Sequence, residues 1–258
     1  MKLTISDKVK RDVFISIFHL LKQSTSAVTL MFLPDHLYIQ GMDNSHVCLF
    51  DIKIMADWFT NYTVNETDLS TVSMDTNIFH MILSVCQDQH SIIIYYEGEP
   101  DTIDIDITNE NSSKDFNKHF RMPLSSIDTE IMHIPETEYD VDISIPSKKF
   151  HEITAQLSMF GDVMNVKCSE ESLSVASNGM NGEMTVDIPI DDLTEYSICE
   201  GENIDVSFSL NYVHKMCLNT KLAPEVQFSI LINQPMRIKY DLGDESRVLF
   251  YIAPTIED

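Results

Sequence analysis

The 258-residue chain is poor in positive charge: it has 17 Lys and Arg residues against 41 Asp and Glu residues, a formal net charge of −24. Such an excess of acid repels nucleic acid, because affinity for DNA depends largely on Lys and Arg side chains that neutralise phosphates. A total charge does not say where the charges lie, however, so it does not exclude a DNA partner. With 43% hydrophobic and 22% charged residues, the chain has the composition of a globular protein and not of a disordered acidic one.

Glycine and cysteine are also scarce. Two of the seven glycines stand in the dipeptides Asn178-Gly179 and Asn181-Gly182, which predict tight turns between strands. The five cysteines are scattered without a Cys-x-x-Cys pair, which is typical of reduced thiols in an intracellular protein. The chain lacks a hydrophobic run of membrane-span length and an N-terminal signal peptide. We therefore expect a soluble protein that stays inside the cell.

The short motifs of common catalytic sites are missing as well. The sequence has no phosphate-binding Gly-rich loop, no His-Glu-x-x-His, no Gly-x-Ser-x-Gly and no metal-like spacing of Cys and His. Asp104 and Asp106 alternate with isoleucines, which is typical of the solvated side of an amphipathic strand and does not indicate a catalytic carboxylate pair. We predict a protein that is not an enzyme and has no cofactor and no metal site.

What the chain does contain is an internal repeat at a spacing of about 136 residues. The segment Asp51-Ile-Lys-Ile54 returns as Asp187-Ile-Pro-Ile190, and His80-Met81 matches Lys215-Met216 at a spacing of 135. Each match is weak alone, but the nearly constant offset across both halves indicates a duplication.

The repeat predicts two similar domains, at residues 1–124 and 140–258, with a connecting loop at residues 125–139. Each half begins with apolar residues at three- and four-residue steps, the pattern of an amphipathic helix, and continues with the alternation of strands. The fold class is therefore α+β. Four helices are expected, at residues 7–23, 76–87, 147–159 and 210–222.

The predicted helices are locally basic. They contain eight basic and three acidic residues, a balance of +5, whereas the rest of the chain has nine basic and 38 acidic residues, a balance of −29. Exposed helix faces usually mix both signs, so a shortage of acid on all four helices suggests a cationic surface on an acidic body. The candidate DNA-facing residues are Lys8, Lys10, Arg11, Lys22, Lys148, Lys149, Lys215 and Lys221.

Three segments match short motifs of one protein family. They are Gly41-Met-Asp-Asn-Ser-His-Val-Cys-Leu49, Ile134-Pro-Glu-Thr-Glu-Tyr139 and Leu249-Phe-Tyr-Ile-Ala-Pro-Thr-Ile-Glu-Asp258. In order and spacing they resemble the proliferating cell nuclear antigen (PCNA) family, the eukaryotic DNA sliding clamps. The resemblance covers essentially the whole chain, although the residues between the motifs have diverged widely. It implies a DNA-clamp fold, with two duplicated domains, helices that line a ring and β-sheets outside.

The function implied by the resemblance is that of a DNA polymerase processivity factor. A homotrimeric ring encircles double-stranded DNA independently of its sequence and tethers polymerase and other replication and repair proteins. Further expected partners are a clamp loader and PIP-box-type peptides, and the expected location is the nucleus, or a cytoplasmic viral replication site if the chain is viral. On matching positions the peptide pocket would consist of Met42, His46, Val47, Met132, Ile134, Pro235, Tyr251, Ala253, Pro254 and Ile256.

Some positions depart from the family's pattern, and other readings stay open. Lys22 matches a ring-lining lysine, but Ala155, Asn211 and Leu218 stand where the family usually has Arg or Lys. One alternative is a clamp-like processivity subunit that acts as a monomer or dimer without closing a ring. Another is an acidic β-rich protein-interaction module with no DNA role.

The subunit interface is predicted from two strands. The family's first intersubunit strand matches residues 115–122 and its partner strand matches residues 182–188. Opposite charges on the two strands would favour their pairing. The charged residues concerned are Lys118, Arg121, Glu183 and Asp187.

Overall fold

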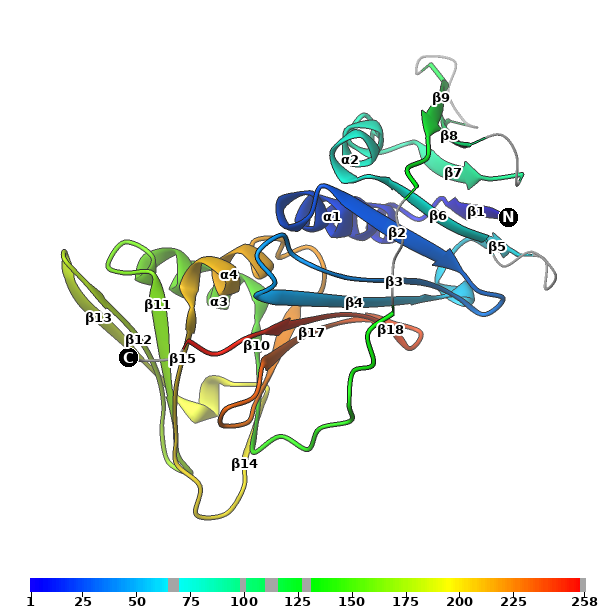
Figure 1. Ribbon diagram of the computed structural model, residues 1–258. Helices are drawn as coiled ribbons and strands as arrows, with labels where there is room; N and C mark the ends of the chain where they lie inside the picture. The colour runs from blue at the N-terminus through cyan, green and yellow to red at the C-terminus, as the bar shows by residue number, and fades with distance from the viewer. Residues whose placement is uncertain (65–69, 98–100, 110–115, 127–130, 256–258) are drawn as a thin grey trace. The chain divides into compact units, whose positions relative to one another are not determined.

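The computed structural model describes residues 1–64, 70–97, 101–109, 116–126 and 131–255 (Figure 1). The chain forms two compact units, and each contains a short segment from the other end of the sequence. Unit 1 consists of Met1–Asn44, Phe50–Met132 and Leu242–Arg247; unit 2 consists of Ser45–Leu49, His133–Asp241 and Val248–Asp258. The linear boundaries given above stay a prediction, and they do not anticipate these exchanged segments.

Unit 1 contains two antiparallel sheets and two helices. One sheet has the strand order β5-β1-β7-β8-β9, and the other contains the consecutive strands β4-β3-β2-β6. The helices are α1 (Lys8–Ser24) and α2 (Thr76–Ser84), and a 3-10 helix, η1, spans Ala56–Trp58. The strands are β1 (Lys2–Ile5), β2 (Ala27–Phe32), β3 (His36–Met42), β4 (Cys48–Met55), β5 (Asn61–Thr63), β6 (Ser70–Asp75), β7 (Ser91–Tyr95), β8 (Thr102–Thr108) and β9 (Lys118–Pro123).

Unit 2 repeats this plan strand for strand, which confirms the duplication and the α+β class. Its strand orders are β14-β10-β16-β17-β18 and β13-β12-β11-β15. The helices are α3 (Ser147–Leu157) and α4 (Leu210–Met216), with a 3-10 helix, η2, at Ile190–Asp192. The strands are β10 (Val141–Pro146), β11 (Val163–Cys168), β12 (Leu173–Gly179), β13 (Gly182–Ile188), β14 (Glu195–Ile198), β15 (Ile204–Ser209), β16 (Glu225–Ile230), β17 (Met236–Gly243) and β18 (Ser246–Ile252).

The spacing of the repeat is not constant. Strands β2 and β11 start 136 residues apart, at residues 27 and 163, as the sequence predicts. The N-cap residues of α2 and α4, Asp75 and Ser209, are 134 residues apart. His80 therefore corresponds to His214, and its match with Lys215 was wrong.

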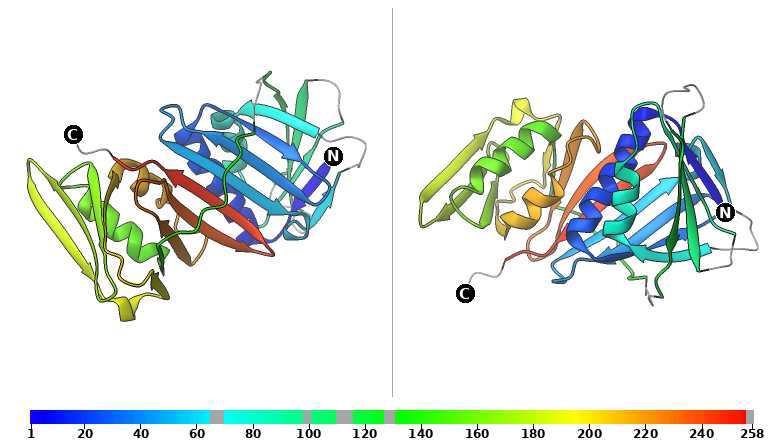
Figure 2. Two further views of the ribbon diagram at one scale, coloured as in Figure 1. Left: turned by 60° about the horizontal axis from the view of Figure 1, so that its bottom comes forward. Right: turned by 90° about the horizontal axis from the view of Figure 1, so that it is seen from above.

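All four helices were predicted, and local chemistry explains where they begin and end. Asp7 caps α1 by accepting a hydrogen bond from Lys10 N at 2.9 Å, and Asp75 caps α2 in the same way through Ile78 N. Helix α4 ends at Met216, earlier than predicted, because the apolar residues that follow, such as Leu222, are buried in a turn. Helix α1 packs beside α2, and α3 beside α4 (Figure 2).

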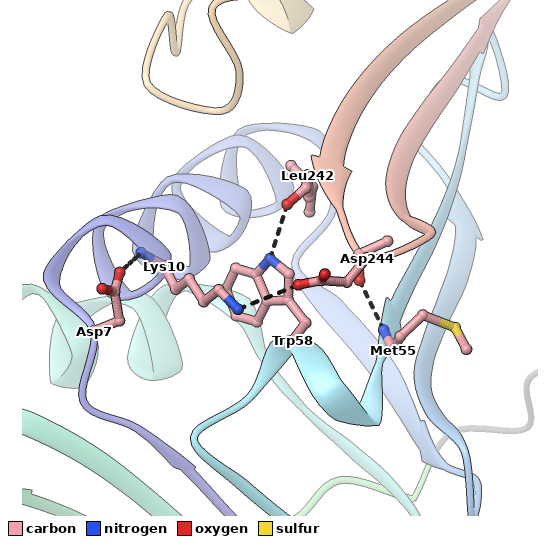
Figure 3. Close-up of polar contacts among 7 residues, drawn as sticks. Asp7, Lys10, Met55, Trp58, Leu242 and Asp244 are labelled. Atoms are coloured by element: carbon pink, nitrogen blue, oxygen red, sulfur yellow. Dashed lines mark hydrogen bonds and ion pairs between the residues drawn. The ribbon is translucent and has the colours of Figure 1, made fainter.

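The segment Leu242–Arg247 belongs to unit 1 because the β17–β18 turn packs on η1 and the start of α1 (Figure 3). Trp58, the only tryptophan in the chain, is buried and donates a hydrogen bond to Leu242 O at 3.2 Å. Lys10 Nζ lies 5.5 Å from the centre of the Trp58 ring and 3.4 Å from Asp244 Oδ2. Lys10 is thus used to attach this turn to the helix.

The β12–β13 hairpin contains both Asn-Gly dipeptides and turns between them, as predicted. Gly179 pairs with Gly182, whose φ of +115° favours glycine. At Gly179 a Cβ atom would lie 2.1 Å from Phe160 O, so a side chain there would collide with the backbone. Across the described residues, no helix is long and apolar enough to cross a membrane.

Candidate functional site

Arg11 cannot take part in a DNA-facing surface. Its side chain is buried, and the guanidinium donates hydrogen bonds to the backbone carbonyls of His90 and, at 3.1 Å, Asp88. A buried charge needs such partners, and here they lie in the loop that follows α2. The assignment of Arg11 from charge sorting was wrong, because its role is to fasten α1 to this loop.

The other seven predicted cations differ in their surroundings. Lys22, Lys148, Lys215 and Lys221 reach solvent, and none has an ion pair within the described part of the chain. Lys22 lies in the last turn of α1, where the helix dipole favours a cation. The other three are partly neutralised by acids: Lys8 by Asp88 at 2.7 Å, Lys10 by Asp244 at 3.4 Å and Lys149 by Asp192 at 3.5 Å.

Each pair of helices also carries two adjacent histidines, which the sequence analysis did not single out. The rings of His19 in α1 and His80 in α2 have centroids 5.2 Å apart. The rings of His151 in α3 and His214 in α4 are at the same distance and nearly parallel, with an interplanar angle of 17°. The signal was the recurrence of histidine in corresponding helices, hidden by the change of repeat spacing.

Burial keeps one histidine of each pair neutral at pH 7. It lowers the pKa of His80 to about 4, with a smaller effect from the charge of Lys22. Burial also lowers the pKa of His214, and His151 adds to that effect. Neither residue therefore adds a positive charge to the helix pairs, and the surface is less basic than the count of residues suggests.

Each unit has an edge strand that is paired on only one side within the described sheets: β9 in unit 1 and β13 in unit 2. On β9, Arg121 Nε lies 2.8 Å from Asp104 Oδ1 of β8, which confirms that this aspartate is on the solvated strand face. Burial of Lys118 is partial. On β13, Glu183 and Asp187 are exposed. The edges thus differ in charge, although both leave peptide groups unpaired.

The predicted peptide-binding residues are divided between the units. Of the ten, Ile256 lies outside the described residues; the other nine are exposed or half-buried, so none of these belongs to a core. Unit 1 contributes Met42 and Met132. Unit 2 contributes His46, Val47, Ile134, Pro235, Tyr251, Ala253 and Pro254, and there Ala253 N donates a hydrogen bond to Val47 O at 3.1 Å.

The surroundings of His80 predict a specific pH dependence of stability. Because the folded state lowers the pKa of His80 from 6.5 to about 4, the unfolded state binds more protons between these values, and stability falls as pH drops through this window. We expect His80→Gln to flatten the decline in the free energy of unfolding between pH 6.5 and 4, measured by urea denaturation. His133→Gln, at an exposed position, is the control; an unchanged slope in the His80 variant would contradict the assignment.

Comparison with known proteins shows what these surfaces belong to. Residues 8–132 match the family model of the proliferating cell nuclear antigen N-terminal domain, and residues 133–255 match that of its C-terminal domain. "Proliferating cell nuclear antigen 2" of Plasmodium falciparum is 26% identical over 97% of this chain and 98% of its own length. "Proliferating cell nuclear antigen" of Chaetomium thermophilum is 27% identical over 85% of both chains, and "Proliferating cell nuclear antigen 2" of Drosophila melanogaster is 24% identical over 92% of both. With both domains matched in order, the chain belongs to the proliferating cell nuclear antigen family and is a DNA sliding clamp, a processivity factor for DNA polymerase.

Proposed function

We propose that this clamp is a homotrimeric ring that forms when β9 of one subunit pairs with β13 of the next. The observation that carries this proposal is the presence of two different unpaired edges, one in each unit. An edge strand offers its free N–H and C=O groups to another chain. Contacts between two different surfaces are head-to-tail and close into a ring when the rotation allows. Lys118 on one edge and Glu183 and Asp187 on the other would favour this pairing over pairing of like edges.

Exposed apolar side chains near both edges support the same association. Ile78, Met81 and Val85 are 40%, 60% and 36% exposed and share one face of the α2 region. Met159 and Met180, which lie at the end of α3 and at the tip of the β12–β13 hairpin, are 62% and 105% exposed. Burial of such side chains on assembly would add hydrophobic stabilisation to the strand pairing.

The mass in solution tests the ring. Light scattering after size exclusion should give three times 29.5 kDa. Met81→Asp should lower this mass to that of a monomer, because a charge placed at the interface cannot be buried without a partner. The matched control is Ile131→Asp, since Ile131 is 59% exposed in the connecting loop. A wild-type mass of one or two subunits would contradict the ring and favour a clamp-like subunit that does not close.

Inside the ring, we propose that helices α1 to α4 face DNA. Lys22, Lys148, Lys215 and Lys221 are the main phosphate contacts, and Lys8, Lys10 and Lys149 contribute less because acids neutralise them in part. Contacts to phosphates position a protein without reading sequence. A small number of weak contacts lets the ring slide, while its closure prevents dissociation.

Retention on DNA of different topology tests this mechanism. The clamp should remain on closed circular duplex DNA and be lost after the circle is linearised, because it then slides off the ends. Lys22→Glu should weaken binding equally on all sequences and reduce the salt slope by about 1. Lys167→Glu, a change of an exposed lysine on β11, should have no effect. Retention that is independent of linearisation would rule out the topological mechanism.

We further propose that partners bind as short PIP-box-type peptides with apolar and aromatic anchors. The nine described pocket residues are accessible, and the connecting loop exposes Ile131 beside the half-buried Met132 and Ile134. The acidic body of the clamp would favour basic residues that flank such anchors. In this proposal the protein acts by tethering and not by catalysis, is placed on DNA by a clamp loader, and works in the nucleus, or at a cytoplasmic replication site if the chain is viral.

Substitutions in the connecting loop test the peptide surface. Met132→Ser and Ile134→Ser should each weaken binding of a labelled PIP-box-type peptide by about 30-fold, since anchor contacts of this kind contribute about 2 kcal/mol. The oligomeric mass should not change. His133→Ser alters the exposed residue between them and should bind as the wild type does. Unchanged affinity in both variants would remove these residues from the binding surface.

A further inference from the structure

The side chain of Gln40, in β3, holds the connecting loop at one residue. Its Oε1 accepts a hydrogen bond from Met132 N at 2.7 Å, and its Nε2 donates one to Met132 O at 3.0 Å. Opposed residues in an antiparallel sheet exchange the same two hydrogen bonds, N–H to O and O to H–N. The amide of Gln40 thus takes the place of a backbone partner for a residue 92 positions later in the chain.

The Gln40 amide is itself held in one orientation. Its Nε2 also donates to Tyr38 Oη at 3.0 Å, and Tyr38 Oη donates to the carboxylate of Asp51. Gln40 is 3% exposed and Asp51 is 6% exposed. If the amide were reversed, its NH₂ group would face Met132 N–H and its oxygen would face Met132 O, so only the observed orientation satisfies all of these groups.

The rest of the loop is attached at few places. Ser125 N donates a hydrogen bond to Ser73 O at 2.7 Å near the start of the loop, and Tyr139 at its end lies 4.5 Å beneath the guanidinium of Arg237. Both neighbours of Met132 in sequence are exposed. Gln40 therefore fixes one residue in a stretch of chain whose neighbouring side chains point to solvent.

We propose that Gln40 is a positioning residue for partner binding. It fixes Met132 on β3 in advance, so that a peptide with apolar and aromatic anchors meets a preformed surface and does not have to order the loop as it binds. This inference rests on the proposed peptide-binding function, because Met132 is one of the residues placed in that surface. Gln40 does not contact the peptide, and its effect passes through the backbone of Met132.

Hydrogen exchange and peptide affinity, measured together, test this role. In Gln40→Leu, a change that keeps side-chain volume but removes both hydrogen bonds, the Met132 amide should exchange at least tenfold faster. The affinity for a fluorescent PIP-box-type peptide should fall about tenfold, while the amide of Ile39 in β3 stays protected and reports an intact fold. Gln40→Glu keeps the acceptor for Met132 N but not the donor to Met132 O, and should lie between the wild type and Gln40→Leu in both measurements.

Tyr38→Phe is the matched control. It keeps both hydrogen bonds between Gln40 and Met132, so exchange at Met132 and peptide affinity should stay within about twofold of the wild type. Unchanged exchange at Met132 in Gln40→Leu would overturn the attachment of the loop. Faster exchange with unchanged peptide affinity would overturn the positioning role. If the wild-type protein binds no peptide, the proposed peptide-binding function fails, and the inference about Gln40 fails with it even if the exchange result holds.

Discussion

A sheet that ends in a strand with unpaired peptide groups constrains everything around it, and each unit of this clamp keeps one such edge. Natural proteins usually protect free edges with charged side chains. On β9, Arg121 and His119 are instead engaged by Asp104 and Asp106 of the neighbouring strand, so they neutralise their own sheet. The backbone of β9 is the feature left for another chain. Because duplication produced two units with different edge strands, the same event that built the subunit also supplied the two halves of an intersubunit contact.

The electrostatic design follows from where the acids lie. Ion pairs with Asp88, Asp244 and Asp192 draw three of the helix lysines toward the acidic body, and Arg11 is consumed by the packing of α1. What remains on the helices is a modest positive charge, with His80 and His214 kept neutral by burial. A clamp has to move along DNA, and each tight phosphate contact would slow that movement. A weakly basic lining on a strongly acidic protein therefore suits a ring that holds DNA by enclosure.

Much of this fold could be predicted from the sequence because it depends on local periodicity. Apolar spacing located all four helices, and two Asn-Gly dipeptides located the β12–β13 turn. The failures share one cause, which is that they depend on residues distant in sequence. Arg11 looks like a surface cation until the carbonyl of Asp88 is seen to accept from it, and the true partner of His80 was hidden by a two-residue change in the repeat spacing. Ion pairs such as that of Lys10 with Asp244, 234 residues apart, leave no pattern in the sequence.

The attachment of the connecting loop shows why a buried polar contact is used where an apolar one would seem sufficient. Apolar contacts are tolerant of small shifts, because side chains of similar size can slide or repack with modest loss. The amide of Gln40 has no such tolerance: its donors and acceptor are satisfied only when Met132 stands at one position, and burial makes an unmet hydrogen bond costly. One polar side chain can therefore define the register of a loop that is otherwise acidic and exposed, and it leaves the apolar side chains of that loop free for partners.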